Sequence, residues 1–396
     1  MRFWGITGTN GKTTTAWIFA AFVDAWGASR RARKRASEAE EADGRDPLCG
    51  YITTVEAFDG ARRFYTGYTT PPLAQLREIY ASMEANGCTD CVMEVSSHAI
   101  HQDRVGFGDV TTFSGGAFTN LTEDHLDYHK TMEEYFRVKR SFAERIAAGR
   151  PGAPYVVCLD GGCGREMLEA CRKLALKVVA VTAGTDGTGG MTPEYDLSWL
   201  QLAGSYNKSN VLVAAALAEV AGVPRDIIQA TIPTLKPRWG RLELVENPCV
   251  KAKAYVDFAH TPDGLEKVLS AARGFTPRGG RLWVVFGAGG DRDPMKRPLM
   301  GAACARLADR LVVTSDNPRS EDPMKIIGQV VAGAEGAKEL HVEPDRRKAI
   351  EFALAEAGAD DVVIIAGKGH ETTQEIKGVK HPFDDREVVR AFAAKG

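Results

Sequence analysis

Short apolar runs alternate with longer stretches of helical composition along most of the chain. The runs are rich in Val, Ile and other strand-forming residues, and each ends in glycine or polar residues. They cover residues 3–7, 89–95, 155–159, 178–182, 253–257, 281–287, 310–314 and 361–367. Segments such as 13–23, 262–273 and 298–308 have helical composition. This alternation is typical of α/β units built on mainly parallel sheets.

One segment interrupts the alternation and predicts a domain boundary. Residues 233–240 contain two prolines and a glycine, which favour a linker over a helix or strand. We therefore expect a first domain over residues 1–239 and a second, smaller, Rossmann-like α/β domain over residues 240–396. This fold name carries no implication of dinucleotide binding.

Composition and charge exclude several classes of protein. The chain has 396 residues, 44% hydrophobic and 26% charged, which is ordinary for a globular protein. Its net charge of −2 gives no overall attraction to nucleic acid or to an anionic membrane. No apolar stretch reaches the roughly 18 residues of a membrane span, and the amino terminus has no long apolar signal segment. We expect a cytoplasmic protein that acts on small molecules, with neither nucleic acid nor membrane as a partner.

A glycine-rich loop follows the first expected strand and opens the first expected helix. Backbone N–H groups in such a loop, together with the helix amino terminus, form an anion site. Lys12 is placed to reach the β- and γ-phosphates of a nucleotide, and the Thr13 hydroxyl to bind Mg²⁺. The order of strand, Gly-Lys-Thr and helix predicts nucleotide phosphate binding. The candidate residues are Gly8, Thr9, Asn10, Gly11, Lys12, Thr13 and Thr14.

Three further positions carry candidate chemistry, each with a plainer alternative. Glu94 ends an expected strand, where α/β sheets place ligands, so it is a candidate magnesium ligand or a solvated acid. His125 lies in a segment rich in acids and histidines, and it is either a ligand or a hydrogen-bonded loop residue. Lys139 begins a helical stretch, where a lone lysine normally lies on the surface.

The sequences around these positions resemble the Mur ligases, from residue 3 to about residue 390. The family motifs recur in order along the chain, and the similarity is greatest to the branch that adds meso-diaminopimelate to UDP-N-acetylmuramoyl-L-alanyl-D-glutamate. The matching motifs are Gly8–Thr14, Thr69–Pro71, Glu94–His98, Asn120–His129, Lys139, Tyr206–Asn210, Gly240–Glu243, Asp257–Pro262, Phe286–Asp293, Asp316–Arg319 and Gly367–Glu371. The resemblance implies a central P-loop ATPase domain followed by an amino-acid-binding domain, with ATP and Mg²⁺ as cofactors.

The resemblance also implies a role for each matching residue. Lys12, Glu94, His125 and Lys139 match catalytic positions, and Lys139 matches a lysine that is carbamylated into a carboxylate-like metal ligand. Thr13, Glu94, His125 and the carbamate of Lys139 would then bind magnesium. Positions that match nucleotide contacts outside the loop are Asn207, Asn210, Arg241, Asp257 and His260. Positions that match contacts to the sugar–peptide acceptor are Thr69, Thr70, Ser96, Gln102 and Arg104.

The segment Asp316-Asn-Pro-Arg319 resembles the signature of family members that add diaminopimelate. The planar fork of Arg319 can hold the distal carboxylate of diaminopimelate, which lysine lacks. The same segment would serve as a simple turn in another context, because Asn-Pro favours turns. Further positions that match amino-acid contacts are Arg292, Asp316, Asn317, Gly367 and Glu371.

The implied reaction is amide formation through an acyl phosphate, in peptidoglycan precursor synthesis and thus in cell shape and division. The chain departs from the family pattern at two points, and these leave the identity of its substrates open. The family's amino-terminal domain, which holds uridine diphosphate, is not seen before Met1, so we expect it to be absent, separate or lost through a misassigned start. Thr372–Thr373 replaces an aromatic stretch near the amino-acid pocket.

Two other functions stay open from the sequence. One is a Mur-like ligase that uses another carboxylate acceptor, such as a γ-glutamyl peptide or a specialised metabolite. The other is a nucleotide-binding protein that has lost catalysis, against which the joint presence of Lys12, Glu94, His125 and Lys139 argues.

Overall fold

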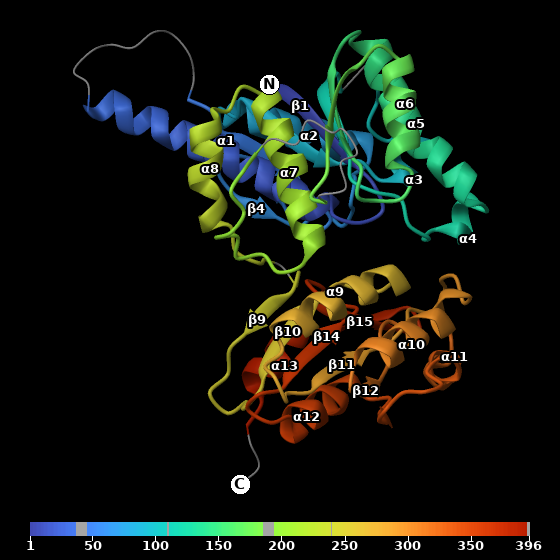
Figure 1. Cartoon of the computed structure of the whole chain (residues 1–396). Coiled ribbons are helices and arrows are strands. Elements are labelled where there is room, and N and C mark those ends of the chain that lie inside the picture. The colour runs from blue at the N-terminus through green and yellow to red at the C-terminus, as the bar shows by residue number, and fades with distance from the viewer. Residues whose placement is uncertain (37–45, 109–110, 185–193, 239, 394–396) are drawn as a thin grey trace. The chain divides into compact units, whose positions relative to one another are not determined.

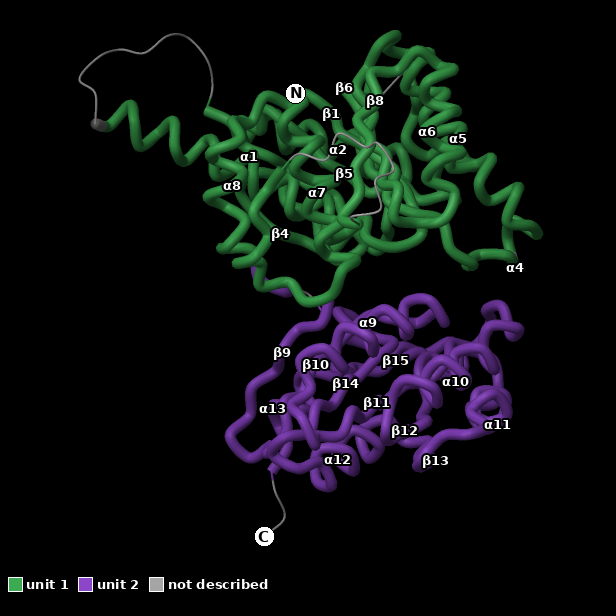
Figure 2. The backbone as a smooth tube through the Cα atoms, in the orientation of Figure 1, with its two compact units in different colours: residues 1–235 green, residues 236–396 purple. Residues whose placement is uncertain are grey.

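The computed structural model describes residues 1–36, 46–108, 111–184, 194–238 and 240–393 (Figure 1). The chain divides into two compact units, Met1–Leu235 and Lys236–Gly396 (Figure 2). The boundary expected from sequence falls a few residues later, at residue 239, which is itself outside the described residues.

Unit 1 is built on one eight-stranded sheet. Its strands, in spatial order, are β4 (Arg63–Phe64), β3 (Ala57–Phe58), β2 (Cys49–Ile52), β5 (Asp90–Glu94), β1 (Arg2–Thr7), β6 (Phe113–Phe118), β7 (Pro154–Cys158) and β8 (Lys177–Val181). The run from β2 to β8 is parallel, and only the short β3 and β4 at the edge are antiparallel. The carboxyl ends of β2, β5, β1 and β6 therefore share one edge of the sheet.

Helices cover both faces of this sheet (Figure 1). They are α1 (Lys12–Ala36), α2 (Leu73–Ala85), α3 (Ser97–His101), α4 (Leu126–His129), α5 (Met132–Gly149), α6 (Gly164–Lys173), α7 (Ser205–Val220) and α8 (Arg225–Thr231), followed by the 3-10 turn Ile232–Thr234. Trp4 of β1 lies against Phe19 of α1, whereas a side chain at Gly5 would overlap Phe142 of α5. Successive residues of β1 thus face opposite layers, as expected of a central parallel strand.

Unit 2 is a smaller α/β sandwich around a six-stranded sheet. Its strands, in spatial order, are β13 (Leu340–Val342), β12 (Arg310–Val313), β11 (Leu282–Phe286), β14 (Val362–Ala366), β10 (Lys253–Asp257) and β9 (Glu243–Val245). All pairs are parallel except that of β9 with β10. Its helices are α9 (Pro262–Phe275), α10 (Lys296–Leu307), α11 (Pro323–Gly333), α12 (Arg346–Glu356) and α13 (Asp385–Ala391). A separate hairpin joins β15 (Thr373–Ile376) to β16 (Val379–Pro382).

The predicted α/β class with mainly parallel sheets is confirmed. Each expected apolar run forms a strand, and the helix expected over residues 13–23 extends through Ala36. No helix in the described part of the chain is long and apolar enough to cross a membrane.

Candidate functional site

The glycine-rich loop joins β1 to α1 and is braced by the segment that follows β6. Thr9 N donates to Asn120 O at 2.9 Å, and Asn10 N donates to Asn120 Oδ1 at 2.9 Å. Gly11 has φ of +85°, and a side chain there would overlap the amide of Asn210. Only glycine adopts this backbone without strain. The loop is therefore held as a preformed backbone cradle.

Lys12 begins α1 and lies over this loop. Its Nζ donates to Gly8 O at 2.9 Å and to Thr9 O at 2.7 Å. The ammonium is thus held beside the backbone groups that would surround a phosphate.

Thr13 and Glu94 meet in the buried interior at the carboxyl ends of β1 and β5. Thr13 Oγ1 donates to Glu94 Oε1 at 2.7 Å. Thr54, which the sequence did not single out, donates to the same carboxylate from its backbone N at 2.8 Å and from its Oγ1 at 3.1 Å. This group of hydroxyl and carboxylate oxygens has the chemistry that Mg²⁺ prefers.

Lys139 lies on the buried side of α5, so the surface location expected of a lone lysine is wrong. Its Nζ donates to Gly8 O at 2.7 Å, and the side chain is 1% exposed. Burial, followed by the nearby charge of Lys12, holds the pKa of Lys139 well below its usual value. A lysine with a lowered pKa is a neutral amine, which is the nucleophilic form.

His125 begins α4 in the left-handed conformation, with φ of 56°. Burial lowers the pKa of His125, Asp124 raises it, and the charges of His98, Lys139 and Lys12 lower it further. The ring centroid of His125 lies 6.0 Å from that of Tyr135, whose hydroxyl lies 3.1 Å from Thr9 Oγ1, so His125 is close to the loop. A neutral imidazole there retains a nitrogen lone pair that can bind a metal.

Asn207 and Asn210 extend the cluster from α7. Asn210 Nδ2 donates to Asn207 Oδ1 at 3.2 Å, and Thr15 Oγ1 donates to Asn210 Oδ1 at 3.5 Å. Both amides therefore lie beside the start of α1.

The expected acceptor-binding residues form two groups separated by α3. Thr70 Oγ1 donates to Glu94 O at 2.8 Å and lies 3.3 Å from Ser96 Oγ, while Thr69 Oγ1 accepts from Thr54. Beyond α3, Arg104 Nε donates to Gln102 Oε1 at 2.7 Å. The first group adjoins the Thr13–Glu94 pair, whereas in the second group Gln102 is exposed and Arg104 is half-buried.

In unit 2, Arg241 and His260 lie against the ring of Phe258, and Asp257 directly precedes that residue at the end of β10. The Arg241 guanidinium lies 4.7 Å from the ring centroid of Phe258, and the His260 ring lies 4.6 Å from it. Burial raises the pKa of the Asp257 carboxyl, and Arg241 opposes this shift. Asp257 accepts hydrogen bonds from the backbone N–H groups of Leu242 and Ala259, both at 2.7 Å.

The expected amino-acid contacts gather at the carboxyl edge of the second sheet. Gly289 lies beside two arginine side chains, because a Cβ there would lie 3.1 Å from Arg319 Nη1 and 3.8 Å from Arg292 Cγ. Asn317 Nδ2 donates to Glu371 Oε2 at 2.9 Å. Gly367, with φ of +117°, follows β14, and a side chain there would overlap the carboxylate of Asp316.

Lys368 is a member of this cluster that sequence reasoning missed. Its side chain is fully buried, and Nζ donates to Glu371 Oε2 at 2.8 Å and to Asn317 Oδ1 at 3.2 Å. A buried cation is normally paired. Here the ion pair with Glu371 lies within the loop after β14, and the hydrogen bond to Asn317 joins that loop to the loop after β12. Its position inside the Gly367–Glu371 motif could have identified Lys368 as a candidate site residue.

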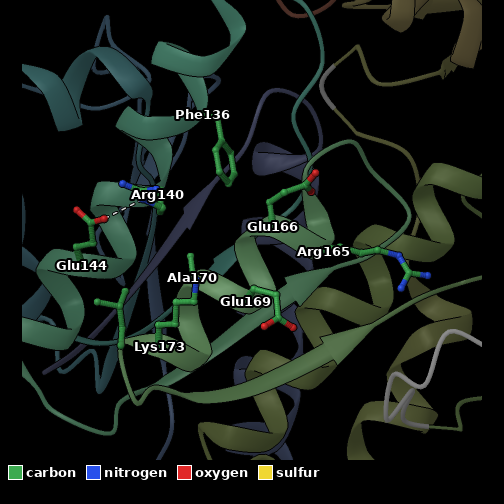
Figure 3. A pocket seen from close by; sticks show the side chains of 9 residues that line it. Phe136, Arg140, Glu144, Arg165, Glu166, Glu169, Ala170 and Lys173 are labelled. Atoms are coloured by element: carbon green, nitrogen blue, oxygen red, sulfur yellow. Dashed lines mark hydrogen bonds and ion pairs between the residues drawn. The ribbon is translucent and has the colours of Figure 1, made fainter.

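A surface pocket of about 570 Å³ lies apart from these clusters (Figure 3). Its walls come from α5 and α6, and Arg140 pairs with Glu144 across one turn of α5. The lining residues are Phe136, Arg140, Glu144, Arg165, Glu166, Glu169, Ala170, Lys173 and Leu174. None of the residues expected to act on a substrate lines it.

Two family models match the chain in the order of its two units. The model described as the Mur ligase middle domain matches residues 6–218, and the model described as Mur ligase, glutamate ligase domain matches residues 240–369. The chain belongs to the Mur ligase family. As a member of this family, it is an ATP-dependent ligase that forms a carbon–nitrogen bond.

Individual Mur ligases match nearly the whole chain. Relatives from Synechococcus elongatus and Ralstonia nicotianae are 39% and 38% identical over all of this chain and 77% of their own length. Both are named UDP-N-acetylmuramoyl-L-alanyl-D-glutamate–2,6-diaminopimelate ligase. A solved structure of that name is 30% identical, with a TM-score of 0.58, and covers 98% of this chain and 77% of its own. The predicted resemblance is thereby confirmed.

A more distant structure shares the fold alone. The Mycobacterium tuberculosis folylpolyglutamate synthase is 19% identical, with a TM-score of 0.61 over 92% of this chain and 88% of its own.

Proposed function

We propose that this chain adds meso-diaminopimelate to UDP-N-acetylmuramoyl-L-alanyl-D-glutamate in peptidoglycan precursor synthesis. The observation that carries the proposal is the arrangement around Gly289 and Asn317. The Arg319 guanidinium and the aliphatic stem of Arg292 lie beside the first residue, and the Glu371 carboxylate accepts a hydrogen bond from the second. The distal end of diaminopimelate bears both a carboxylate and an ammonium, which these charges complement. The reaction would take place in the cytoplasm, where ATP is available.

The residues of unit 1 fit ATP and magnesium. The loop offers backbone N–H groups and Lys12 to the phosphates. The described residues contain no group of three or more His, Cys, Asp or Glu that could hold a metal, so the proposed ligands must include other oxygens. Thr13 and Glu94 would hold one magnesium ion, and His125 with carbamylated Lys139 would hold another. Bound magnesium would neutralise charge on the phosphates.

The proposed chemistry has two steps. A carboxylate oxygen of the acceptor attacks the γ-phosphorus of ATP, which forms an acyl phosphate and releases ADP. The amine of diaminopimelate then attacks the acyl carbon, loses a proton, and expels inorganic phosphate as the amide forms. Thr69, Thr70, Ser96, Gln102 and Arg104 would orient the acceptor. Lys12 would offset the negative charge that gathers between carboxylate and phosphates, and Asn207, Asn210, Arg241, Asp257 and His260 would hold the nucleotide.

A single assay tests this function. The purified chain is incubated with ATP, Mg²⁺ and the UDP-linked acceptor, together with meso-diaminopimelate, L-lysine or no amino acid. We expect ADP release that depends on diaminopimelate, and a product whose mass is that of the acceptor plus diaminopimelate minus water. ADP release with lysine and not with diaminopimelate would contradict the proposed selectivity.

Arg319→Lys tests the carboxylate clamp. A guanidinium offers two parallel hydrogen bonds to a carboxylate, whereas an ammonium acts as a point charge. We expect the KM for diaminopimelate to rise at least about tenfold, because a charge-assisted hydrogen bond contributes roughly 1.5–3 kcal/mol. The KM for ATP serves as the internal control and should not change. An unchanged KM for diaminopimelate would remove Arg319 from the binding site.

A further inference from the structure

The hairpin of β15 and β16 is joined to the Asp316–Arg319 segment by several hydrogen bonds. Arg319 N donates to Glu375 O at 3.0 Å, and Lys377 N donates to Arg319 O at 2.6 Å. Glu375 N donates to Asn317 Oδ1 at 2.9 Å, and Gln374 Nε2 donates to Asp316 O at 2.7 Å. A two-stranded hairpin is marginally stable alone. Its position is therefore set by the loop that it contacts.

These bonds place an acidic side chain beside the proposed clamp. Glu375 Oε2 lies 3.6 Å from Arg319 Nε, and Arg319 Nη1 donates to Gly290 O at 2.7 Å. The Arg319 side chain is 22% exposed and that of Glu375 is 30% exposed. The guanidinium thus has a carboxylate partner from its own chain while remaining accessible to another.

We infer that Glu375 is a specificity-determining residue whose carboxylate takes the position of the substrate's distal carboxylate until the amino acid binds. This inference rests on the proposed function, because it takes Arg319 as the clamp. An incoming carboxylate must share or take over the guanidinium, and its charge repels that of Glu375. An amino acid without a distal carboxylate leaves the Arg319–Glu375 pair intact. Glu375 therefore lowers affinity only for a ligand that uses Arg319.

The hairpin also supplies a second partner for the displaced carboxylate. Lys380 of β16 is directly opposite Glu375 of β15 in the antiparallel register, and it is exposed. Directly opposite residues on an antiparallel pair project from the same face. A side-chain rotation of Glu375 from Arg319 toward Lys380 is thus available when a substrate carboxylate arrives.

Glu375→Gln tests the inference, with Glu356→Gln as the matched control. Glu356 is exposed on α12, outside the hairpin and the Asp316–Arg319 segment. We expect Glu375→Gln to lower the KM for meso-diaminopimelate by up to about fivefold, because an exposed ion pair contributes at most about 1 kcal/mol. The kcat and the KM for ATP should stay unchanged, and an Arg319→Ala background should abolish the gain. A KM for diaminopimelate that equals or exceeds that of Glu356→Gln would overturn the inference.

A second measurement separates failure of this inference from failure of the proposed function. If the parent chain forms no product with diaminopimelate, the function fails, and inorganic sulfate becomes the probe of Arg319. Calorimetric titration should then give tighter sulfate binding to Glu375→Gln than to Glu356→Gln, and Arg319→Ala should remove the difference. Equal sulfate affinity in the two glutamine variants would show that the Glu375 carboxylate does not compete with an anion for Arg319. This result would contradict the inference whatever the substrate is.

Discussion

Lys139→Ala is expected to abolish ligation while ATP binding is retained. The buried, neutral Lys139 amine can attack CO₂, forming a bond between Nζ and carbon and releasing one proton, to give a carbamate anion. That anion would hold magnesium beside the loop, which alanine cannot do. Because loss of one preorganised charge-stabilising group typically costs about a hundred- to a thousandfold in rate, we expect ADP release to fall at least that far. Calorimetric titration with ATP would measure retained binding.

A control variant and a rescue experiment make this test specific to Lys139. Lys173→Ala removes an exposed lysine on α6 and should leave the rate unchanged. Small carboxylates such as acetate or propionate should partly restore the Lys139→Ala variant, because they place a carboxylate in the vacated space. Ligation by Lys139→Ala at the parent rate would exclude Lys139 from the mechanism.

Asp385→Ala is expected to destabilise unit 2 by about 3–5 kcal/mol, because it leaves a buried arginine without its counter-charge. Arg346 Nε donates to Asp385 Oδ1 at 2.8 Å, and Nη2 donates to Oδ2 at 2.7 Å. Both side chains are fully buried. Arg346 Nη2 also donates to Ala366 O at 2.9 Å, at the end of β14. The pair thus anchors the strand that leads into Gly367.

Urea unfolding of the full chain, followed by tryptophan fluorescence, measures this effect. Glu387→Ala is the control, since Glu387 pairs with Arg390 on the same helix but both side chains are at least half exposed. The control should change the free energy of unfolding by less than about 1 kcal/mol. Equal shifts for the two variants would show that burial does not decide the strength of the Arg346–Asp385 pair.

The sequence predicts those parts of the fold that depend on local pattern. Each long apolar run became a parallel strand, because a strand buried on both faces requires an uninterrupted apolar segment. The expected runs did not include the antiparallel edge strands β3, β4 and β9, since two or three residues carry little periodicity. They also did not include the parallel strands β2, β6 and β13, which are short or, in β6, contain two glycines. Their pairing depends on neighbours distant in the chain.

In the candidate site too, features set by local sequence could be predicted, and features set by distant contacts could not. The loop around Lys12 is contiguous, so its spacing alone indicates phosphate chemistry. Lys139 and Lys368 each look like surface residues in isolation, yet both are buried against groups far away in the sequence. Only family similarity pointed to Lys139, and nothing pointed to Thr54, whose bond to Glu94 spans forty positions. Tertiary packing decides which distant groups a single polar side chain contacts, and these contacts cannot be predicted from the pattern of one sequence.

The glycines before Asp291 limit the substitutions that the Arg292–Arg319 cluster can accept. A side chain on Gly287 would overlap Thr314 O, one on Gly290 would overlap Pro318 O, and one on Gly289 would crowd Arg319. Every amino-acid change reached by one base substitution in a glycine codon adds a side chain. A side chain on Gly287 or Gly290 would push apart two backbones that now touch, and one on Gly289 would displace the Arg319 guanidinium. An evolutionary change in the amino-acid substrate should therefore occur through substitutions at positions such as Glu375, where the charge of a side chain can change without displacing the backbone.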